Sequence, residues 1–161
     1  MYEPSIVVKK AGLNDIDDLL VMIEKFYRFN EEFDPAWSVK EEARSAAREL
    51  ALKYIRDPSS VVLVAQIEGK TIGFIRAEIR ENPILENGRL GIIVELYVHP
   101  QYRRRGVAKR LVEEASKELA SRGVNVVGAE FPAANSIAKA FYENLGFRPY
   151  ISVYIKEVEG T

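Results

Sequence analysis

Three consecutive arginines precede a glycine where a predicted strand gives way to a predicted helix. Residues 92–98 are mostly apolar and β-branched, which is typical of a buried strand, and Pro100 ends it. From Val107 onward apolar residues recur every three or four positions, which indicates a helix. The first N–H groups of a helix lack partners and lie at the positive end of its dipole, and Gly106 leaves this backbone accessible. The loop therefore predicts a binding site for a phosphate group.

Two glutamates lie in predicted strands, and each could act as a general base. Glu95 interrupts an apolar strand, where a carboxylate is unfavourable unless it is paired or used in chemistry. Glu130 lies at the end of the next strand, five residues before Asn135. An ion pair at a strand end explains either residue equally well, so the pattern leaves both interpretations open.

The arginine loop and a later segment resemble the two signatures of the GNAT superfamily of acyl-CoA N-acyltransferases. Residues 103–108, RRRGVA, resemble its Q/R-x-x-G-x-G/A signature, with Ala108 in place of the second glycine. Residues 135–147 resemble its second hallmark, an asparagine with a tyrosine seven residues later and then Leu-Gly-Phe. The two signatures occur in the expected order, and the resemblance extends from Ile92 to Phe147.

This resemblance implies direct transfer of an acetyl group from acetyl-CoA to a primary amine, without a covalent enzyme intermediate. An alkylammonium group, whose pKa is about 10, must lose a proton before it attacks, and the departing thiolate needs a proton. Tyr142 matches the family's tyrosine and is predicted to supply that proton, although a core aromatic would show the same pattern. Glu95 is slightly preferred as base or amine anchor over Glu130, which resembles the base of ribosomal-protein alanine acetyltransferases.

The resemblance also implies where acetyl-CoA binds. The pantetheine would pair with the backbone of the signature strand where two strands part, and Asn135 is expected both to cap a helix and to contact that arm or a bound water. We expect the arginine loop to hold the diphosphate. We prefer this interpretation to a solvated basic loop or a patch that binds nucleic acid. The predicted cofactor-binding residues are Leu96, Tyr97, Val98, Arg103, Arg104, Arg105, Gly106, Val107, Ala108, Lys109, Asn135 and Tyr142.

The composition argues against several other functions. A length of 161 residues predicts a single domain over residues 1–161, and the net charge of −1 gives no overall attraction to nucleic acid or membranes. The chain has no cysteine and one histidine, which argues against disulfides, a thiolate nucleophile and a histidine-rich metal site. Neither a signal peptide nor a membrane-spanning apolar run is recognisable, so we expect a cytoplasmic protein with no metal.

Hydrophobic periodicity predicts the elements that position these residues. Strands are predicted over residues 5–10, 61–68, 71–80, 89–99, 124–131 and 151–158. Helices are predicted from an N-cap at Asn14 to Phe33, from a capping box at Ser38 to about Arg56, and over residues 107–121 and 135–145. The order βααβββαβαβ resembles the GNAT fold, an α/β (α+β) architecture with a mixed, mostly antiparallel central sheet of six to seven strands and helices on both faces.

Several functional questions stay open at this point. The acceptor could be a small amine, such as a polyamine-like or antibiotic-like molecule, a peptide N-terminus or a lysine. A catalytically silent CoA-binding module that acts as a regulatory or partner-binding domain is the alternative function. The acidic residues at positions 31, 32 and 34 are either a solvated helix end or an attractor for a cationic amine. Ile151, Val153 and Ile155 alternate with less apolar residues, which fits either a core strand or a homodimer interface.

Overall fold

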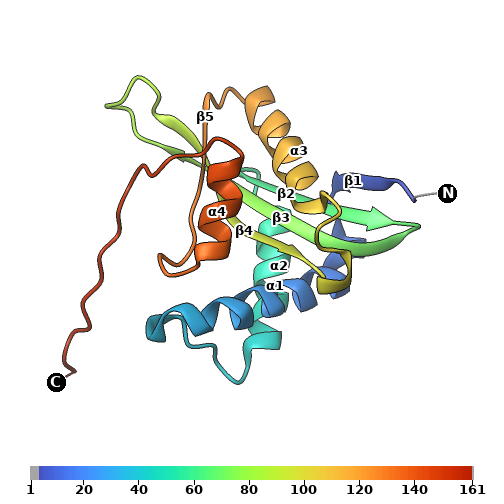
Figure 1. Cartoon of the computed structure of the whole chain (residues 1–161), viewed down its shortest axis with the longest axis horizontal. Coiled ribbons are helices and arrows are strands. Elements are labelled where there is room, and N and C mark those ends of the chain that lie inside the picture. The colour runs from blue at the N-terminus through green and yellow to red at the C-terminus, as the bar shows by residue number, and fades with distance from the viewer. Residues whose placement is uncertain (1–3, 161) are drawn as a thin grey trace.

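Five strands form one mixed sheet in a computed structural model that describes residues 4–160 (Figure 1). The strands are β1 (Ile6–Lys10), β2 (Ser60–Ile67), β3 (Lys70–Glu81), β4 (Arg89–Val98) and β5 (Val126–Ala129). The helices are α1 (Ile16–Asn30), α2 (Ala43–Arg56), α3 (Val107–Ser121) and α4 (Ser136–Asn144). The sheet follows chain order, with antiparallel pairing from β1 to β4 and parallel pairing of β4 with β5.

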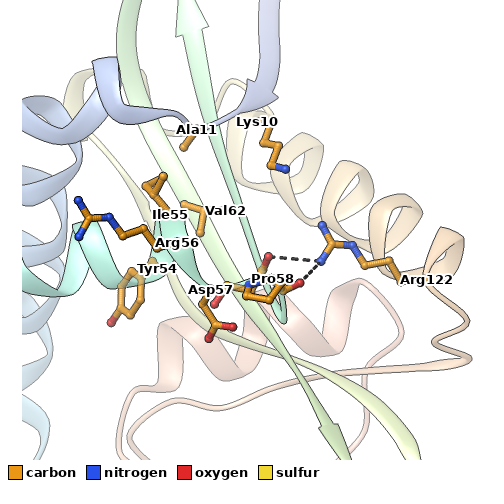
Figure 2. Close-up of a pocket in the computed structure, with 10 residues that line it drawn as sticks. Lys10, Ala11, Tyr54, Ile55, Arg56, Asp57, Pro58, Val62 and Arg122 are labelled. Carbon is orange, nitrogen blue, oxygen red and sulfur yellow. Dashed lines mark hydrogen bonds between the residues drawn. The ribbon is translucent and has the colours of Figure 1, made fainter.

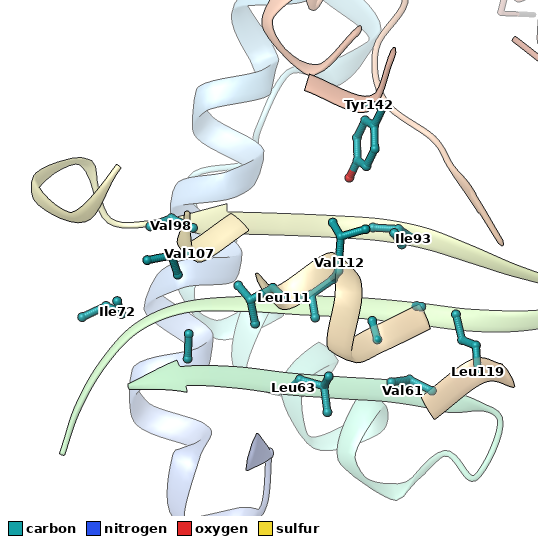
Figure 3. Close-up of a cluster of buried hydrophobic side chains, with 14 of the residues drawn as sticks. Val61, Leu63, Ile72, Ile93, Val98, Val107, Leu111, Val112, Leu119 and Tyr142 are labelled. Atoms are coloured by element: carbon teal, nitrogen blue, oxygen red, sulfur yellow. The ribbon is translucent and has the colours of Figure 1, made fainter. Parts of the chain in front are cut away.

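Two apolar clusters fix helices to the two faces of the sheet. On one face α1 and α2 bury Leu19, Met22 and Ala51 against Phe74 of β3. On the other face, α3 contributes an apolar stripe that packs on β2, β3 and β4 (Figure 3). The stripe consists of Val107, Leu111, Val112, Ala115 and Leu119. Helices therefore cover both faces, as predicted.

Two predicted helix starts are wrong because nearby residues form separate 3-10 turns. The N–H of Gly12 donates to the Asp15 carboxylate at 2.8 Å, so α1 begins after Asp15 and not after an N-cap at Asn14. The Ser38 hydroxyl donates backward to the Pro35 carbonyl at 2.9 Å and ends a short turn, so the expected capping box does not form. Helix α2 starts only at Ala43.

The prediction of six to seven strands is also wrong, because residues 151–158 form no strand. In the part of the chain that the structure describes, this segment has no strand partner, and its side chains are exposed. A strand needs a neighbour to satisfy its backbone groups, and an alternating sequence alone does not supply one. In Figure 1 the segment leaves α4 and runs away from the sheet toward the C-terminus.

Candidate active site

Strands β4 and β5 separate halfway along β4. Their pairing runs from Leu90 opposite Val126 to Ile93 opposite Ala129, and the N–H of Glu130 then donates to the Ile93 carbonyl at 3.0 Å. Beyond this point β4 continues to Val98 beside β3 alone. Within residues 4–160, no strand lies along the other edge of residues 94–98. An edge of this kind can accept an extended ligand in the manner of an added strand.

Tyr142 of α4 points toward β4 (Figure 3). Its ring is held by Phe131, which stacks on it at 5.6 Å between ring centroids, and by edge contacts with Phe141 and Phe147. Burial raises the pKa of the Tyr142 hydroxyl above its usual value, so the hydroxyl stays protonated at neutral pH. No hydrogen bond joins this hydroxyl to any residue among 4–160. The phenol is therefore a fixed proton donor without a partner in the described protein.

Asn135 links α4 to α1. Its side-chain oxygen accepts from the N–H of Ala138 at 3.0 Å, which confirms the predicted helix cap. Its amide group donates to the Asn30 side chain at 3.0 Å, and Asn30 in turn donates to the Phe26 carbonyl at 2.9 Å. Both asparagines are buried. The contact of Asn135 with a pantetheine arm stays a prediction, and one of its two amide hydrogens is available for it.

The arginine loop presents a row of free backbone N–H groups. Arg104 and Gly106 both adopt left-handed backbone conformations, with φ of 63° and 78°. Helix α3 begins its hydrogen bonding with the Arg110 N–H, which donates to the Gly106 carbonyl at 3.0 Å. The N–H groups of residues 104–109 find no acceptor among the described residues. A Cβ built on Gly106 meets nothing within 4 Å, so the space next to the backbone is open at this position. The loop can therefore bind an anion.

Glu95 lies inside the protein, where its carboxylate is fully satisfied. It is 0% exposed, forms an ion pair with Arg76 of β3, and accepts a hydrogen bond from the Tyr54 hydroxyl at 3.0 Å. The Arg76 guanidinium also lies over the Tyr54 ring, 4.0 Å from its centroid. Burial raises the pKa of Tyr27 on α1, and the negative charge of Glu95 raises it further. An amine cannot contact the Glu95 carboxylate in this arrangement.

Glu130 lies at the surface, directly after β5 and at the point where the two strands part. Its carboxylate is half exposed and forms an ion pair with Arg80 of β3. Arg80 also donates to Glu78 at 2.8 Å. Of the two candidate bases, Glu130 is therefore the one that a molecule in solution can reach.

Comparison with known proteins decides the family. The family model for the acetyltransferase (GNAT) family matches residues 23–147. The chain belongs to this family. An uncharacterized N-acetyltransferase of Archaeoglobus fulgidus is 28% identical over 141 residues, which are 88% of this chain and 92% of the relative.

Two solved structures show that this GNAT protein shares the fold of known acetyltransferases. The aminoglycoside N-acetyltransferase AAC(6')-Iy in complex with CoA matches with a TM-score of 0.81 and 16% identity, over 99% of this chain and 98% of that one. The ribosomal-protein-alanine N-acetyltransferase from Brucella melitensis biovar Abortus matches with a TM-score of 0.72 and 18% identity, over 96% and 100%. The predicted family, enzyme class and α+β GNAT fold are confirmed.

Arg103 supports the GNAT signature strand. Its guanidinium Nε donates to the Val98 carbonyl at 3.0 Å, and the group lies 5.7 Å from the Phe29 ring and 5.8 Å from the Tyr97 ring. This places the Arg103 side chain between β4 and α1. The sequence did not predict this role, because Phe29 is far away along the chain.

The side chains of the signature strand itself belong to the two apolar clusters. Tyr97 packs with α1 and α2, whereas Val98 and the half-buried Leu96 pack on the α3 side. Their side chains are therefore used in the core, and the backbone role of Val98 in ligand binding stays a prediction. Val107 is buried in the core and Ala108 is half-buried, so the predicted role of these two residues in binding would rest on their amides.

A cavity of about 240 Å³ lies elsewhere, at the C-terminal ends of α2 and α3 (Figure 2). Arg122 closes one side of it and donates to the carbonyl groups of Pro58 at 2.9 Å and Ser60 at 3.4 Å. The arginine loop is at the other end of α3, so this cavity is not part of the GNAT site. Tyr54 lines it and is the residue that connects it to Glu95.

Within residues 4–160, no three His, Cys, Asp or Glu side chains are grouped so that they could hold a metal ion. None of the helices in this range has the length and apolar character needed to cross a membrane.

Proposed function

We propose that this protein transfers an acetyl group from acetyl-CoA to an amine, and that the transfer takes place at the open segment of β4 beneath Tyr142. The observation that carries the proposal is the juxtaposition of these two features. Residues 94–98 offer an unpaired backbone edge, and α4 directs a protonated phenol without a protein partner toward β4. The first group can bind an extended acyl carrier, and the second can donate a proton.

Acetyl-CoA would be held by three parts of the chain. The free N–H groups of residues 104–109 suit its diphosphate, since they are at the positive end of the α3 dipole. Arg104, Arg105 and Lys109 are exposed and add positive charge there. The edge of β4 suits the amide groups of the pantetheine arm. The thioester sulfur would then leave as a thiol, with its proton taken from the Tyr142 hydroxyl.

The ammonium form of the acceptor must lose a proton before it attacks, and we assign this step to Glu130. Its carboxylate is exposed and lies where the acyl group would emerge between β4 and β5. Glu130 would take the proton directly or through a water molecule. Glu95 was the slightly preferred base from sequence, but its enclosure and its ion pair with Arg76 support a structural role instead.

The acceptor would approach from the side of α1 and α2. There Tyr27 and Trp37 stack with 5.6 Å between ring centroids, a surface that can contact a cation or an aliphatic chain. Two of the acidic side chains nearby already accept hydrogen bonds from the backbone of this chain. Glu31 accepts from the Val39 N–H at 2.9 Å, and Asp34 accepts from the Ala36 N–H at 2.8 Å. Glu32 is exposed and would attract a cationic amine. Both a small polyamine-like or aminoglycoside-like amine and a peptide N-terminus fit this description.

The test is a thiol-release assay with acetyl-CoA and a panel of polyamines, aminoglycosides, amino acids and peptides. The panel is repeated with Tyr142→Phe, which keeps the ring contacts and removes only the unpartnered hydroxyl. We expect turnover by the wild type and a loss of kcat of about 100-fold in the variant, in line with general acid catalysis. The matched control is Tyr150→Phe, which changes an exposed tyrosine and should leave kcat unchanged.

Two results would contradict the proposal. Full activity of Tyr142→Phe would remove the phenol from the chemistry. Binding of CoA without turnover of any amine in a broad panel would favour the alternative, a silent CoA-binding module.

A further inference from the structure

Helix α4 is attached to the rest of the protein mainly by apolar contacts. Tyr142 and the aromatic rings around it pack against the core cluster under α3, and contacts of this kind have little directional preference. Within residues 4–160, a single hydrogen bond joins the segment 131–160 to earlier residues. It runs from the Asn135 amide to the Asn30 side chain, at 3.0 Å. The end of α1 therefore makes the one directional contact with α4.

The orientation of each amide in this hydrogen bond is set by a second partner on the amide's own helix. The Asn30 nitrogen donates to the Phe26 carbonyl at 2.9 Å, so the Asn30 oxygen faces Asn135. The Asn135 oxygen accepts from the Ala138 N–H at 3.0 Å, so the Asn135 nitrogen faces Asn30. Both residues are buried, with exposed fractions of 2% and 4%. A buried bond whose donor and acceptor are both specified favours one arrangement of the two helices.

The same end of α1 also contacts the open part of β4. The ring centroid of Phe29, the residue before Asn30, lies 5.7 Å from the Arg103 guanidinium. Arg103 in turn donates to the Val98 carbonyl at the end of β4, at 3.0 Å. The pairing of β4 with β5 has already ended, at Ile93. The last turn of α1 therefore connects the end of β4 with the start of α4, beyond the point where the two strands separate.

We infer, on the basis of the proposed function, that Asn30 is a positioning residue for acetyl transfer. Through Asn135 it holds α4 in place, and with it the Tyr142 phenol over the open segment of β4 (Figure 3). Tyr142 follows Asn135 by seven residues, about two helical turns, so the two side chains lie on the same side of α4. Asn30 is buried and acts only through Asn135. Its role matters because a displacement of about 1 Å at a reacting group can cost about 100-fold in rate.

The test compares Asn30→Ala with Ile23→Val in the thiol-release assay, at a temperature well below the unfolding midpoints of both variants. Asn30→Ala removes the acceptor for the Asn135 amide, and we expect kcat to fall about tenfold, the factor that corresponds to one hydrogen bond. Ile23→Val is the matched control. It removes one carbon atom from the buried side of the same helix, which lowers stability to a comparable degree without a change at α4, so kcat should stay unchanged.

A double-mutant cycle with Tyr142→Phe separates positioning of the phenol from a general structural effect. If Asn30 acts by placing the Tyr142 hydroxyl, its removal costs nothing further once that hydroxyl is gone. We therefore expect Asn30→Ala/Tyr142→Phe to have the same kcat as Tyr142→Phe alone. Losses that multiply in the double variant would mean that Asn30 does not act through the phenol, and would overturn the inference.

Hydrogen exchange of the protein without ligand gives a readout that does not depend on activity. The amides of residues 139–144 in α4 should exchange faster in Asn30→Ala than in the wild type, and at the wild-type rate in Ile23→Val. The inference is also overturned by unchanged exchange in α4, by full kcat of Asn30→Ala, or by equal losses of kcat in the two variants. A wild type that acetylates no amine would contradict the proposed function instead, and the exchange of α4 would still show whether Asn30 holds this helix.

Discussion

At the scale of single residues, the two candidate bases differ in their access to solvent. Glu95 is enclosed by Arg76 and Tyr54, whereas Glu130 extends from the end of β5 into solvent. Both residues are glutamates next to the same pair of strands, Glu95 within β4 and Glu130 directly after β5. The neighbours supplied by other elements therefore determine which carboxylate an amine can reach.

Removal of the Glu130 carboxylate should slow the reaction without unfolding the protein. We expect Glu130→Gln to lower kcat by about 100-fold near neutral pH, because the base is lost, and to recover part of that loss as pH rises and the amine deprotonates by itself. A pH profile of kcat measures both effects. Glu78→Gln is the control, since it removes the other carboxylate that binds Arg80. Equal losses in the two variants would show that Arg80 pairing, and not proton removal, explains the effect.

Loss of Arg76 should destabilise the fold. Arg76→Met leaves the fully buried Glu95 carboxylate without its cation, which should lower the free energy of unfolding by about 3–5 kcal/mol. Urea unfolding measures this change. The double variant Arg76→Met/Glu95→Gln leaves no buried charge without a partner. Its free energy of unfolding should therefore fall by less than that of Arg76→Met. A double variant that is less stable than Arg76→Met would contradict the buried ion pair.

At the scale of elements, the loop before α3 leads into the N-terminus of a helix. Its backbone has open space beside it at Gly106. Gly106 has a φ of 78° and open space where a Cβ would lie. Helix α3 is anchored in the core by Val107, so the position of its first N–H groups is fixed. A rigid terminus with free N–H groups is what an anion site on a helix requires.

A charge placed at this terminus should interfere with CoA binding. We expect Gly106→Glu to weaken the affinity for CoA by tenfold or more, about 1.4 kcal/mol, because a carboxylate would occupy the position of the phosphate. Gly106→Ala is the control, since it carries the same left-handed backbone strain of about 1–2 kcal/mol without the charge. Calorimetric titration with CoA compares the two. Equal affinities of Gly106→Glu and the wild type would remove the loop from the CoA site.

At the scale of the whole molecule, the proposed CoA site is assembled from several segments of the fold. It uses the edge of β4, the loop before α3 and the side chain of Tyr142 on α4. Asn135 and Asn30 join α4 to α1 through one buried hydrogen bond. A ligand that contacts all these segments binds the folded state and not the unfolded chain.

CoA should therefore raise the midpoint of thermal unfolding. At a concentration of about 100 times its dissociation constant, the stabilisation is about 2.7 kcal/mol. Differential scanning calorimetry with and without CoA measures it, and adenosine, which lacks the diphosphate and the pantetheine, is the control ligand. The absence of any shift at saturating CoA would contradict the proposed donor site.

Features set by neighbours along the chain were predictable from the sequence. The turn at Gly106, the apolar stripe of α3 and the cap at Asn135 follow from local hydrogen bonding and from the 3.6-residue period of a helix, and the structure has all three. The pattern at Ser38 also looked local, but Asp34 and Pro35 form a competing turn. Local patterns succeed where one local structure is favoured, and fail where two compete for the same residues.

The sequence alone determined the family, through two signatures that are each contiguous in the chain, and with it most of the residues placed in the candidate site. The tertiary structure alone decided that β4 and β5 separate after Ile93, and that Glu95 is bound by residues 19 and 41 positions away. It also decided that residues 151–158 pair with no strand among residues 4–160. These features depend on contacts between distant segments. A sequence pattern records which side chains favour burial or pairing, but only the folded chain brings their partners to them.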